Sequence, residues 1–199
     1  MRGATSYERE MEMNFFEWIL ARWRKQPATP GIPSEVARAY ERWSKGDFAN
    51  KQWIAEMDYS INSRYPRLFI YDMLNHKLYK YKAAHGQGGK NSSPHDGKAR
   101  EFSNVEGSHM SCLGCFRTGA VYNGANGMSL RLHGLDDTND NAARRAVVLH
   151  KTDYVHDGDT SICGRTWGCI GVDRLALSSI LAKLKEGTCL YSHNGGRLS

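Results

Sequence analysis

Cys169 has the surroundings that a cysteine nucleophile requires. It lies in the stretch GRTWGCIG, residues 164–171, directly after Gly168. A nucleophilic thiol needs a base or cation that favours the thiolate, backbone amides that bind an oxyanion, and partial exposure. Gly168 has no side chain, so a carbonyl substrate can approach the backbone closely there. We therefore expect the amides of Gly168 and Cys169 to donate to an oxyanion.

His150 is the candidate base for this thiol. It lies 19 positions before Cys169 and follows the apolar run AVVL, residues 146–149, which predicts a strand buried on both faces. Two neighbouring strands joined by the intervening loop would bring the imidazole to the thiol, where it can act as base and then as acid. Alone, each residue is more often structural. Together they predict catalysis.

The other four cysteines are Cys112, Cys115, Cys163 and Cys189. Cys112 and Cys115 have the CxxC spacing of zinc and redox sites, but the sequence contains no second pair of this kind. A disulfide between these two would close a very small ring, and pairing of either with Cys163 or Cys189 is equally compatible. Five cysteines fit an oxidising compartment with one free thiol, and they fit a reducing one as well.

The elements that must position these residues begin with helices and continue with strands. Residues 8–26 place apolar side chains at helical spacing, and a second helix is predicted from Ser34 to about Gly46. A third is predicted after Asp173, with Asp173 as its N-cap. Segments rich in β-formers, or with alternating polar and apolar residues, are 67–74, 77–86, 128–135 and 144–155.

The order of these elements predicts a mainly β fold with accessory helices (α+β). Residues 1–57 form a helical N-terminal extension, and residues 58–199 form the catalytic domain. The strands follow one another without regular intervening helices, so we expect a mostly antiparallel sandwich or barrel. A long polar loop at residues 86–101 is expected to be functional or mobile.

Composition limits the classes of protein that fit. The chain has 199 residues and a formal net charge of +6, with dispersed Lys and Arg. Dispersed charge favours an anionic polymer such as a bacterial wall over nucleic acid as partner. No apolar run is long enough to span a membrane. The first residues are charged and no apolar signal region follows them, which predicts either a removed signal or another export route.

The segment from His150 to Cys169 resembles the signature of L,D-transpeptidases with a YkuD-type catalytic domain. That signature is a histidine, a spacer and then Ser/Thr-His-Gly-Cys; here Thr166, Gly168 and Cys169 occupy three of the four last places. Further segments similar to one subfamily follow in order over residues 58–191. The resemblance implies a YkuD-like β-sandwich catalytic domain with no cofactor and no metal.

The resemblance also implies a reaction on the peptide stem of peptidoglycan, a tetrapeptide ending in D-Ala. Cys169 would attack the carbonyl of the third residue, and the thioester would pass to a stem amine, a D-amino acid or water. The products would be 3-3 crosslinks, exchanged stems or tripeptides, the last by L,D-carboxypeptidase trimming.

The resemblance assigns roles to several residues around the nucleophile. His150 would be base and acid, Arg165 and Thr166 would orient the stem, and His133 and Ser129 would line the cleft. Trp167 stands where most of the family has histidine, so we expect it to influence substrate choice. Ile170-Gly171 lacks the arginine or asparagine that often follows the nucleophile, which leaves Arg165 to supply the cation.

Two other classes of protein remain open from the residues. Sortases and chymotrypsin-like viral proteases also place histidine before cysteine. A non-enzymatic zinc- or wall-binding module would use His133, His150, Cys163 and Cys169. For the enzyme, the site of action is the bacterial periplasm or wall, either as a housekeeping enzyme or as an antibacterial effector. An effector of this kind would be a toxin delivered by type VI secretion and would have an immunity protein as partner.

Overall fold

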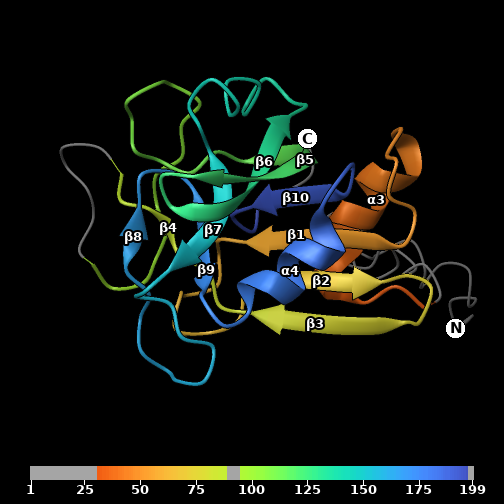
Figure 1. Ribbon diagram of the computed structural model, residues 1–199, viewed down its shortest axis with the longest axis horizontal. Coiled ribbons are helices and arrows are strands. Elements are labelled where there is room, and N and C mark those ends of the chain that lie inside the picture. The colour runs from red at the N-terminus through yellow and green to blue at the C-terminus, as the bar shows by residue number, and fades with distance from the viewer. Residues whose placement is uncertain (1–30, 89–94, 197–199) are drawn as a thin grey trace, which may run out of the picture. The chain divides into compact units, whose positions relative to one another are not determined.

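The computed structural model describes residues 31–88 and 95–196 of the chain. Residues 32–88 and 95–196 belong to one compact unit (Figure 1). The helix predicted over residues 8–26 and part of the loop predicted over residues 86–101 lie outside the described residues. No helix in the described ranges is long and apolar enough to cross a lipid bilayer.

Two sheets contain the strands. The strands of the large sheet are β1 (Trp53–Asp58), β2 (Leu68–Asp72), β3 (Lys77–Tyr81), β5 (Gly114–Gly124), β6 (Gly127–Gly134), β7 (Val148–Thr152), β9 (Ile170–Asp173) and β10 (Cys189–His193). Its order is β3-β2-β1-β10-β5-β6-β7-β9, and a small sheet pairs β4 (His85–Gly86) with β8 (Arg165–Thr166). The mainly β fold is therefore confirmed, with a short helical segment before the first strand.

Most neighbouring strands of the large sheet are antiparallel, as expected, but two of its pairs are parallel. These are β1 with β10 and β7 with β9, and the β4–β8 pair of the small sheet is parallel as well. A parallel pair needs a crossover connection, and between β7 and β9 the chain forms β8 and leaves the large sheet. That crossover carries the GRTWGC stretch.

The large sheet buries apolar side chains on both faces. The larger core contains Met57, Leu130, Leu149 and Ile170 together with the buried stripe of α4 (Leu177–Leu184). On the other face, Ile54, Phe69, Cys115 and Cys189 pack with Val36 and Ala39, from the 3-10 helix η1 (Ser34–Val36) and from α3 (Ala37–Lys45). Burial on this scale, at about 25 cal/mol per Å² of apolar surface, is the main force that holds the strands together. Figure 1 shows α4 lying across strands of the sheet.

The predicted domain boundary after residue 57 falls inside β1. This strand pairs with β2 on one side and with β10 on the other, so residues before the boundary belong to the sheet. The Glu56 carboxylate also accepts a hydrogen bond from the Ala39 amide at 2.9 Å, which ties α3 to the same strand. The helix predicted from Ser34 is confirmed, and it packs on the sheet rather than standing apart from it.

Two local predictions differ from the structure. Ala146 was expected to begin a buried strand, but it is exposed and has φ 54°, a turn conformation; β7 begins at Val148. Asp173 was expected to cap the C-terminal helix. It ends β9 instead, and its carboxylate accepts from the Leu175 amide in the turn before α4, whose N-cap is Ala176. Both differences arise because a turn precedes the element that the sequence pattern predicted to start earlier.

Candidate active site

Cys169 lies at the end of a tight turn that follows β8. Thr166, 5% exposed, holds this turn: its hydroxyl donates to the Cys169 carbonyl at 2.7 Å and accepts from the Gly168 amide at 3.2 Å. One side chain thus joins both ends of the turn. The thiol itself is half-buried and contacts the Ala146 carbonyl at 3.6 Å.

Gly168 can only be glycine without strain at this position. Its φ is +115°, and a Cβ there would lie 2.7 Å from the Met110 carbonyl oxygen. The Ser111 hydroxyl donates to the Gly168 carbonyl at 3.3 Å and accepts from the Gly86 amide at 3.0 Å. The nucleophile turn therefore packs directly against residues 110–111 and against β4.

His150 is oriented by the backbone next to it. Its Nδ1 lies 2.7 Å from the Lys151 carbonyl oxygen. A carbonyl oxygen only accepts, so Nδ1 carries the hydrogen and Nε2 is the ring nitrogen that can take a proton. This is the tautomer that a general base needs.

The strand register brings His150 and Cys169 to neighbouring strands. His150 is level with Gly171 in the parallel β7–β9 pair, and Cys169 lies two residues before Gly171, directly before β9 begins. Leu149 and Ile170, which are paired in this register, point into the larger core. Side chains alternate between the two faces along a strand, so His150 points away from that core.

Gly171 lets the small sheet pack over this face. A Cβ at Gly171 would lie 2.6 Å from the Thr152 methyl, 3.1 Å from the Thr166 methyl and 3.2 Å from Ala84. The Gly171 carbonyl accepts from the Ala84 amide at 2.7 Å. Close contact at this point brings β8, and with it the nucleophile turn, against β9.

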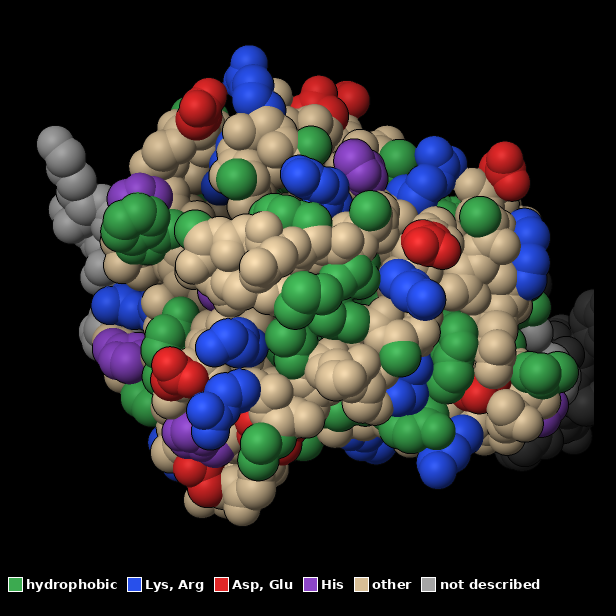
Figure 2. Space-filling view, viewed as in Figure 1, with side chains coloured by type: hydrophobic (Ala, Val, Ile, Leu, Met, Phe, Trp, Pro, Cys, Tyr) green, Lys and Arg blue, Asp and Glu red, His purple; other side chains and the backbone are tan. Residues whose placement is uncertain are grey.

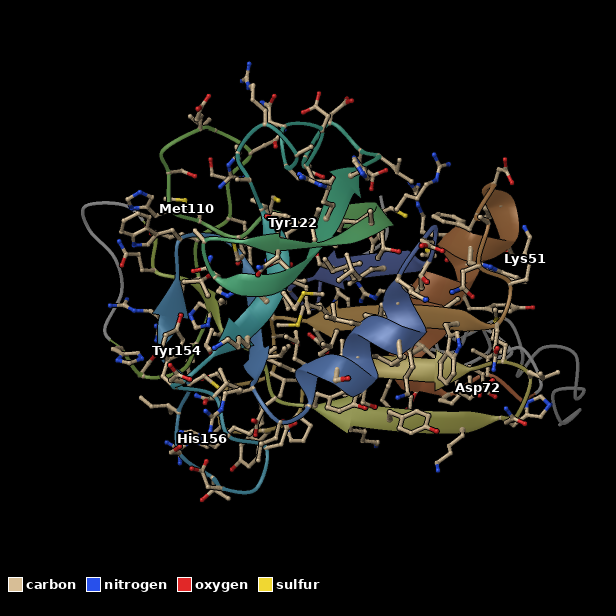
Figure 3. All side chains as sticks on the ribbon, in the orientation of Figure 1. Lys51, Asp72, Met110, Tyr122, Tyr154 and His156 are labelled. Atoms are coloured by element: carbon tan, nitrogen blue, oxygen red, sulfur yellow. The ribbon has the colours of Figure 1, made fainter. Side chains whose placement is uncertain are left out.

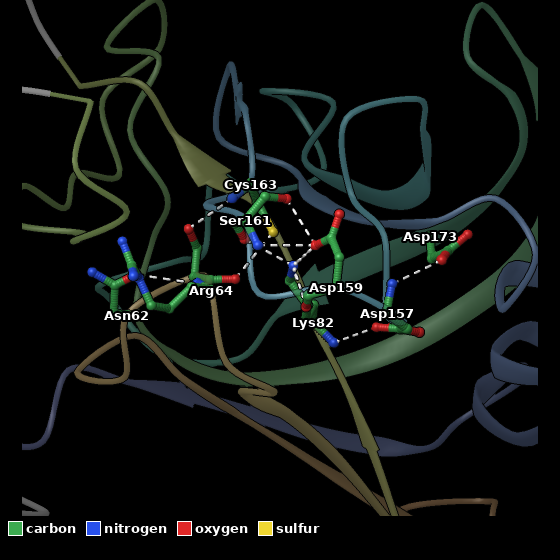
Figure 4. A network of polar contacts seen from close by, with 9 residues as sticks. Asn62, Arg64, Lys82, Asp157, Asp159, Ser161, Cys163 and Asp173 are labelled. Carbon is green, nitrogen blue, oxygen red and sulfur yellow. Dashed lines mark hydrogen bonds and ion pairs between the residues drawn. The ribbon is translucent and has the colours of Figure 1, made fainter.

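The loop between His150 and Cys169 is anchored by a polar network (Figure 4). Lys82 is 1% exposed, and its ammonium group donates to the Asp159 carboxylate at 2.8 Å and to the Ser161 carbonyl at 2.8 Å. Asp157 accepts from the Lys82 amide at 2.6 Å and donates its own amide to Asp173 at 2.9 Å. A buried ammonium with several oxygen partners fixes the loop that connects the two candidate catalytic strands.

Burial sets the resting protonation of both groups. It lowers the pKa of His150, against the opposing effect of the Lys151 carbonyl. It raises the pKa of the Cys169 thiol, against the backbone of Val148 and the charge of Arg145. Both shifts favour the neutral form. The pair therefore rests as neutral thiol and neutral imidazole.

The structure places the residues of the GRTWGC stretch in different surroundings. The Arg165 guanidinium donates to the Gln87 carbonyl at 3.3 Å, and its strand pairs with His85. Trp167 is 70% exposed, and its ring stacks on His109 at 4.7 Å with an interplanar angle of 11°. Figure 3 labels Met110 and Tyr154 on the β8 side of the molecule, and Figure 2 shows hydrophobic and His side chains together on that edge.

Of the two residues expected to line the cleft from β6, one adjoins His150. Ser129 is directly opposite His150 in the antiparallel β6–β7 pair, although its hydroxyl donates to the Gly127 carbonyl at 2.9 Å. His133 is exposed four residues further along β6, where it packs against Gly119 and pairs with Arg117. Four residues of strand span about 13 Å. Ser129 therefore adjoins His150, and His133 lies further along the strand.

The expected zinc ligands are not brought together. Cys163 is buried, and its thiol donates to the Ser63 carbonyl at 3.2 Å. Within the described ranges no group of three or more His, Cys, Asp or Glu side chains is placed to hold a metal. All five cysteines are free thiols, and Cys115 and Cys189 have their sulfur atoms 3.8 Å apart. Cys112 and Cys115 pack into different cores.

Arg145 and Ser111 are two residues of the site region that no sequence pattern indicates. Arg145 comes just before the strand that carries His150, next to a second arginine, and nothing in the pattern distinguishes the two. Ser111 lies in SCLGC, where the cysteines draw attention first. The importance of Ser111 and Arg145 is visible only in the structure, where both lie against the nucleophile turn.

A family model for the L,D-transpeptidase catalytic domain matches residues 28–193 of this chain. No curated protein sequence matches it. Among solved structures, the helical cell shape determining protein Pgp2 (K307A mutant) from Campylobacter jejuni is 13% identical with a TM-score of 0.47; the match covers 84% of this chain and 58% of that one. An L,D-transpeptidase from Mycobacterium smegmatis is 10% identical with a TM-score of 0.43, covering 71% and 58%.

An L,D-transpeptidase (Yku) from Stackebrandtia nassauensis is 13% identical with a TM-score of 0.42, covering 89% of this chain and 76% of that one. The chain thus spans less than two thirds of the length of the first two structures. The family match covers most of the chain, and it includes β7, the nucleophile turn and β9. This chain belongs to the L,D-transpeptidase catalytic domain family.

Proposed function

We propose that this protein is a cysteine-dependent L,D-transpeptidase that acts on the peptide stems of peptidoglycan. The observation that supports the proposal is the β7–β9 register, in which His150, with its imidazole in the tautomer of a base, is level with Gly171, two residues after Cys169. Membership of the family supports the reaction class. The substrate is a stem tetrapeptide that ends in D-Ala.

The first half-reaction forms a thioester. His150 Nε2 takes the thiol proton as Cys169 Sγ attacks the carbonyl carbon of the third stem residue. Backbone amides of the turn stabilise the negative charge on the carbonyl oxygen by donating hydrogen bonds to it. The Gly168 amide already donates to Thr166, so the Cys169 amide is the proposed donor. The imidazolium then protonates the amine of D-Ala, the C–N bond breaks and D-Ala leaves.

The second half-reaction restores the thiol. An amine of a neighbouring stem, the amine of a D-amino acid or a water molecule attacks the thioester carbonyl. His150 takes a proton from the nucleophile and returns one to the departing thiolate. A 3-3 crosslink, an exchanged stem or a tripeptide results, and the last outcome is L,D-carboxypeptidase activity.

Residues on the rim of the turn orient the stem in this proposal. Arg165 binds a stem carboxylate, since a guanidinium pairs with carboxylates in a fixed geometry. Trp167 presents one face of its ring to the substrate, because the other face rests on His109. Thr166 acts through the turn, since both of its hydrogen bonds lie within it.

Muropeptide analysis tests the proposed function. The protein is incubated with sacculi rich in tetrapeptide stems, with and without added D-amino acid, and the products are identified by mass. Crosslinked dimers, exchanged stems or tripeptides each name the acceptor. The variant Cys169→Ala should yield none of them. Cys163→Ala, which removes a buried thiol outside the site, is the matched control and should keep activity. Equal activity of Cys169→Ala and the parent protein refutes the proposal.

The biological setting is a second proposal, an antibacterial effector that reaches the periplasm of a rival cell by type VI secretion. The wall-directed reaction supports it, since uncontrolled stem trimming or exchange would damage a wall. Expression in a host with and without periplasmic targeting tests it. Toxicity must require both the periplasm and Cys169, and a cognate immunity protein must relieve it. A harmless periplasmic protein with intact muropeptide activity refutes the effector role and leaves the enzyme standing.

A further inference from the structure

Arg145 is held in one place by three hydrogen bonds to a single segment of the chain. Its Nη1 donates to the Ser103 carbonyl at 2.6 Å, and its Nη2 donates to the Ser108 hydroxyl at 3.1 Å and to the Met110 carbonyl at 2.7 Å. A planar guanidinium with three fixed acceptors loses little freedom on binding anything further. Its charge therefore has a defined position.

That position is against the nucleophile turn. Arg145 Nη2 lies 3.4 Å from the point that a Cβ of Gly168 would occupy. The next residue, Ala146, accepts from the Cys169 thiol through its carbonyl at 3.6 Å. Ala146 has φ 54°, a left-handed conformation that costs a non-glycine residue about 1 kcal/mol or more. Contacts of neighbouring residues must hold Ala146 in this conformation, and the hydrogen bonds of Arg145 are made by the residue directly before it.

The other titratable groups that face Cys169 are neutral at physiological pH. Burial raises the pKa of Tyr59 to about 12 and that of Cys112 to about 11, and it raises the pKa of Tyr154 as well. Burial lowers the pKa of His150. Among the residues that the structure describes, Arg145 carries a charge that acts on the thiol, and its effect is to lower the thiol pKa against the desolvation that raises it.

We propose that Arg145 is a positioning residue of this active site, which stabilises the developing Cys169 thiolate by its charge and clamps residues 103–110 against the nucleophile turn. The inference rests on the proposed function only in taking Cys169 as the nucleophile. The sequence predicted that Arg165 supplies the cation near the nucleophile, and the proposal gives this role to Arg145. Arg165 instead donates to Gln87, on the β4 side of the turn.

The chain offers a matched control one residue away. Arg144 carries the same charge, but its side chain is 67% exposed and pairs with Glu106 at 3.7 Å. Replacing it changes the net charge of the protein by the same amount without touching the turn. Any difference between variants at the two positions therefore comes from location and not from overall charge.

The test is the pH dependence of Cys169 alkylation by iodoacetamide, read by peptide mass mapping so that each thiol is followed separately. Arg145→Gln should raise the midpoint by about one pH unit, which makes alkylation at neutral pH about tenfold slower. Arg144→Gln should leave the midpoint unchanged. An unchanged midpoint in a folded Arg145→Gln protein, judged by circular dichroism and thermal melting, overturns the proposal.

Arg145→Lys covers the case in which the glutamine variant does not fold. This variant keeps the positive charge but loses the planar guanidinium with its several donors. The midpoint of Cys169 alkylation should therefore stay closer to that of the parent protein, while kcat/KM falls at least tenfold. An unchanged kcat/KM in this variant overturns the clamp. The midpoint is measured without substrate. A protein inactive on every stem thus refutes the proposed function alone, and an active enzyme whose midpoint ignores Arg145 refutes the inference alone.

Discussion

Thr166→Val removes the hydroxyl that closes the nucleophile turn and nearly preserves the shape of the side chain. The hydroxyl makes two hydrogen bonds, at 2.7 Å to the Cys169 carbonyl and at 3.2 Å from the Gly168 amide. Each contributes about 1 kcal/mol, so the free energy of unfolding should fall by about 2 kcal/mol. The loss approaches 4 kcal/mol if the Gly168 amide finds no new partner in its buried position.

The effect on activity should be larger than the effect on stability alone suggests. Displacement of a reacting group by a fraction of an ångström to an ångström costs up to about 100-fold in rate. We expect kcat/KM for D-Ala release to fall by about that factor in Thr166→Val. Thr166→Ser keeps the hydroxyl and should retain most of the rate and stability.

Two assays on the same preparations separate these effects. Urea denaturation gives the free energy of unfolding, and coupled detection of D-Ala gives kcat/KM. Equal losses in Thr166→Val and Thr166→Ser would refute the reasoning, because the methyl contacts and not the two hydrogen bonds would then hold the turn. A full rate in a destabilised Thr166→Val protein would show that the turn geometry does not limit catalysis.

Three further predictions follow from burial and backbone geometry. The kcat/KM profile should have its acid limb below pH 6.5 and its alkaline limb above pH 9, because burial lowers the pKa of His150 from 6.5 and raises that of Cys169 from 9.0; an alkaline limb below pH 9, as expected when a resting thiolate–imidazolium pair loses the imidazolium proton, would contradict this. Burial and the charge of Arg67 lower the pKa of His85 from 6.5 to about 3, so its neutral form stabilises the fold above pH 6.5 and this contribution is lost as the pH falls toward 3. Urea denaturation at pH 7 and pH 4 should show about 3 kcal/mol more acid destabilisation in the parent protein than in His85→Gln, and equal pH sensitivity of the two proteins is the contrary result. Gly168→Ala should lower the free energy of unfolding by about 1–3 kcal/mol, since φ is +115° and the new methyl meets the Met110 carbonyl; a fully stable variant would show that the turn relaxes easily.

Patterns in single segments predicted the candidate catalytic strand β7 well. The apolar run before His150 indicated a buried strand, and Val147 to Leu149 are buried as expected. The glycine before Cys169 was singled out for its missing side chain, and the structure adds that its φ is +115°. These features are local, because burial and backbone freedom depend on neighbours in sequence. The order His150 then Cys169 was enough to suggest one β–loop–β unit.

Features that depend on contacts between distant segments were not predictable in the same way. Arg145 donates hydrogen bonds to residues 103–110, and Lys82 anchors the loop near Asp159. Neither contact can be predicted from the pattern of polar and apolar residues in the segments that it joins. The place of β1 in the sheet was not predictable for the same reason, because it depends on pairing with β10, at the other end of the chain. Side chains that join distant segments acquire their role from the topology.

A covalent intermediate on Cys169 is the most direct test of the account. The protein is mixed with a stem tetrapeptide and quenched in acid within one turnover, and its intact mass and peptides are measured. We predict an adduct with the mass of the tripeptide acyl group on the peptide that contains Cys169, together with one equivalent of released D-Ala. Cys163→Ala should form the same adduct and Cys169→Ala should form none. D-Ala release by Cys169→Ala, or an adduct on another residue, would contradict the account.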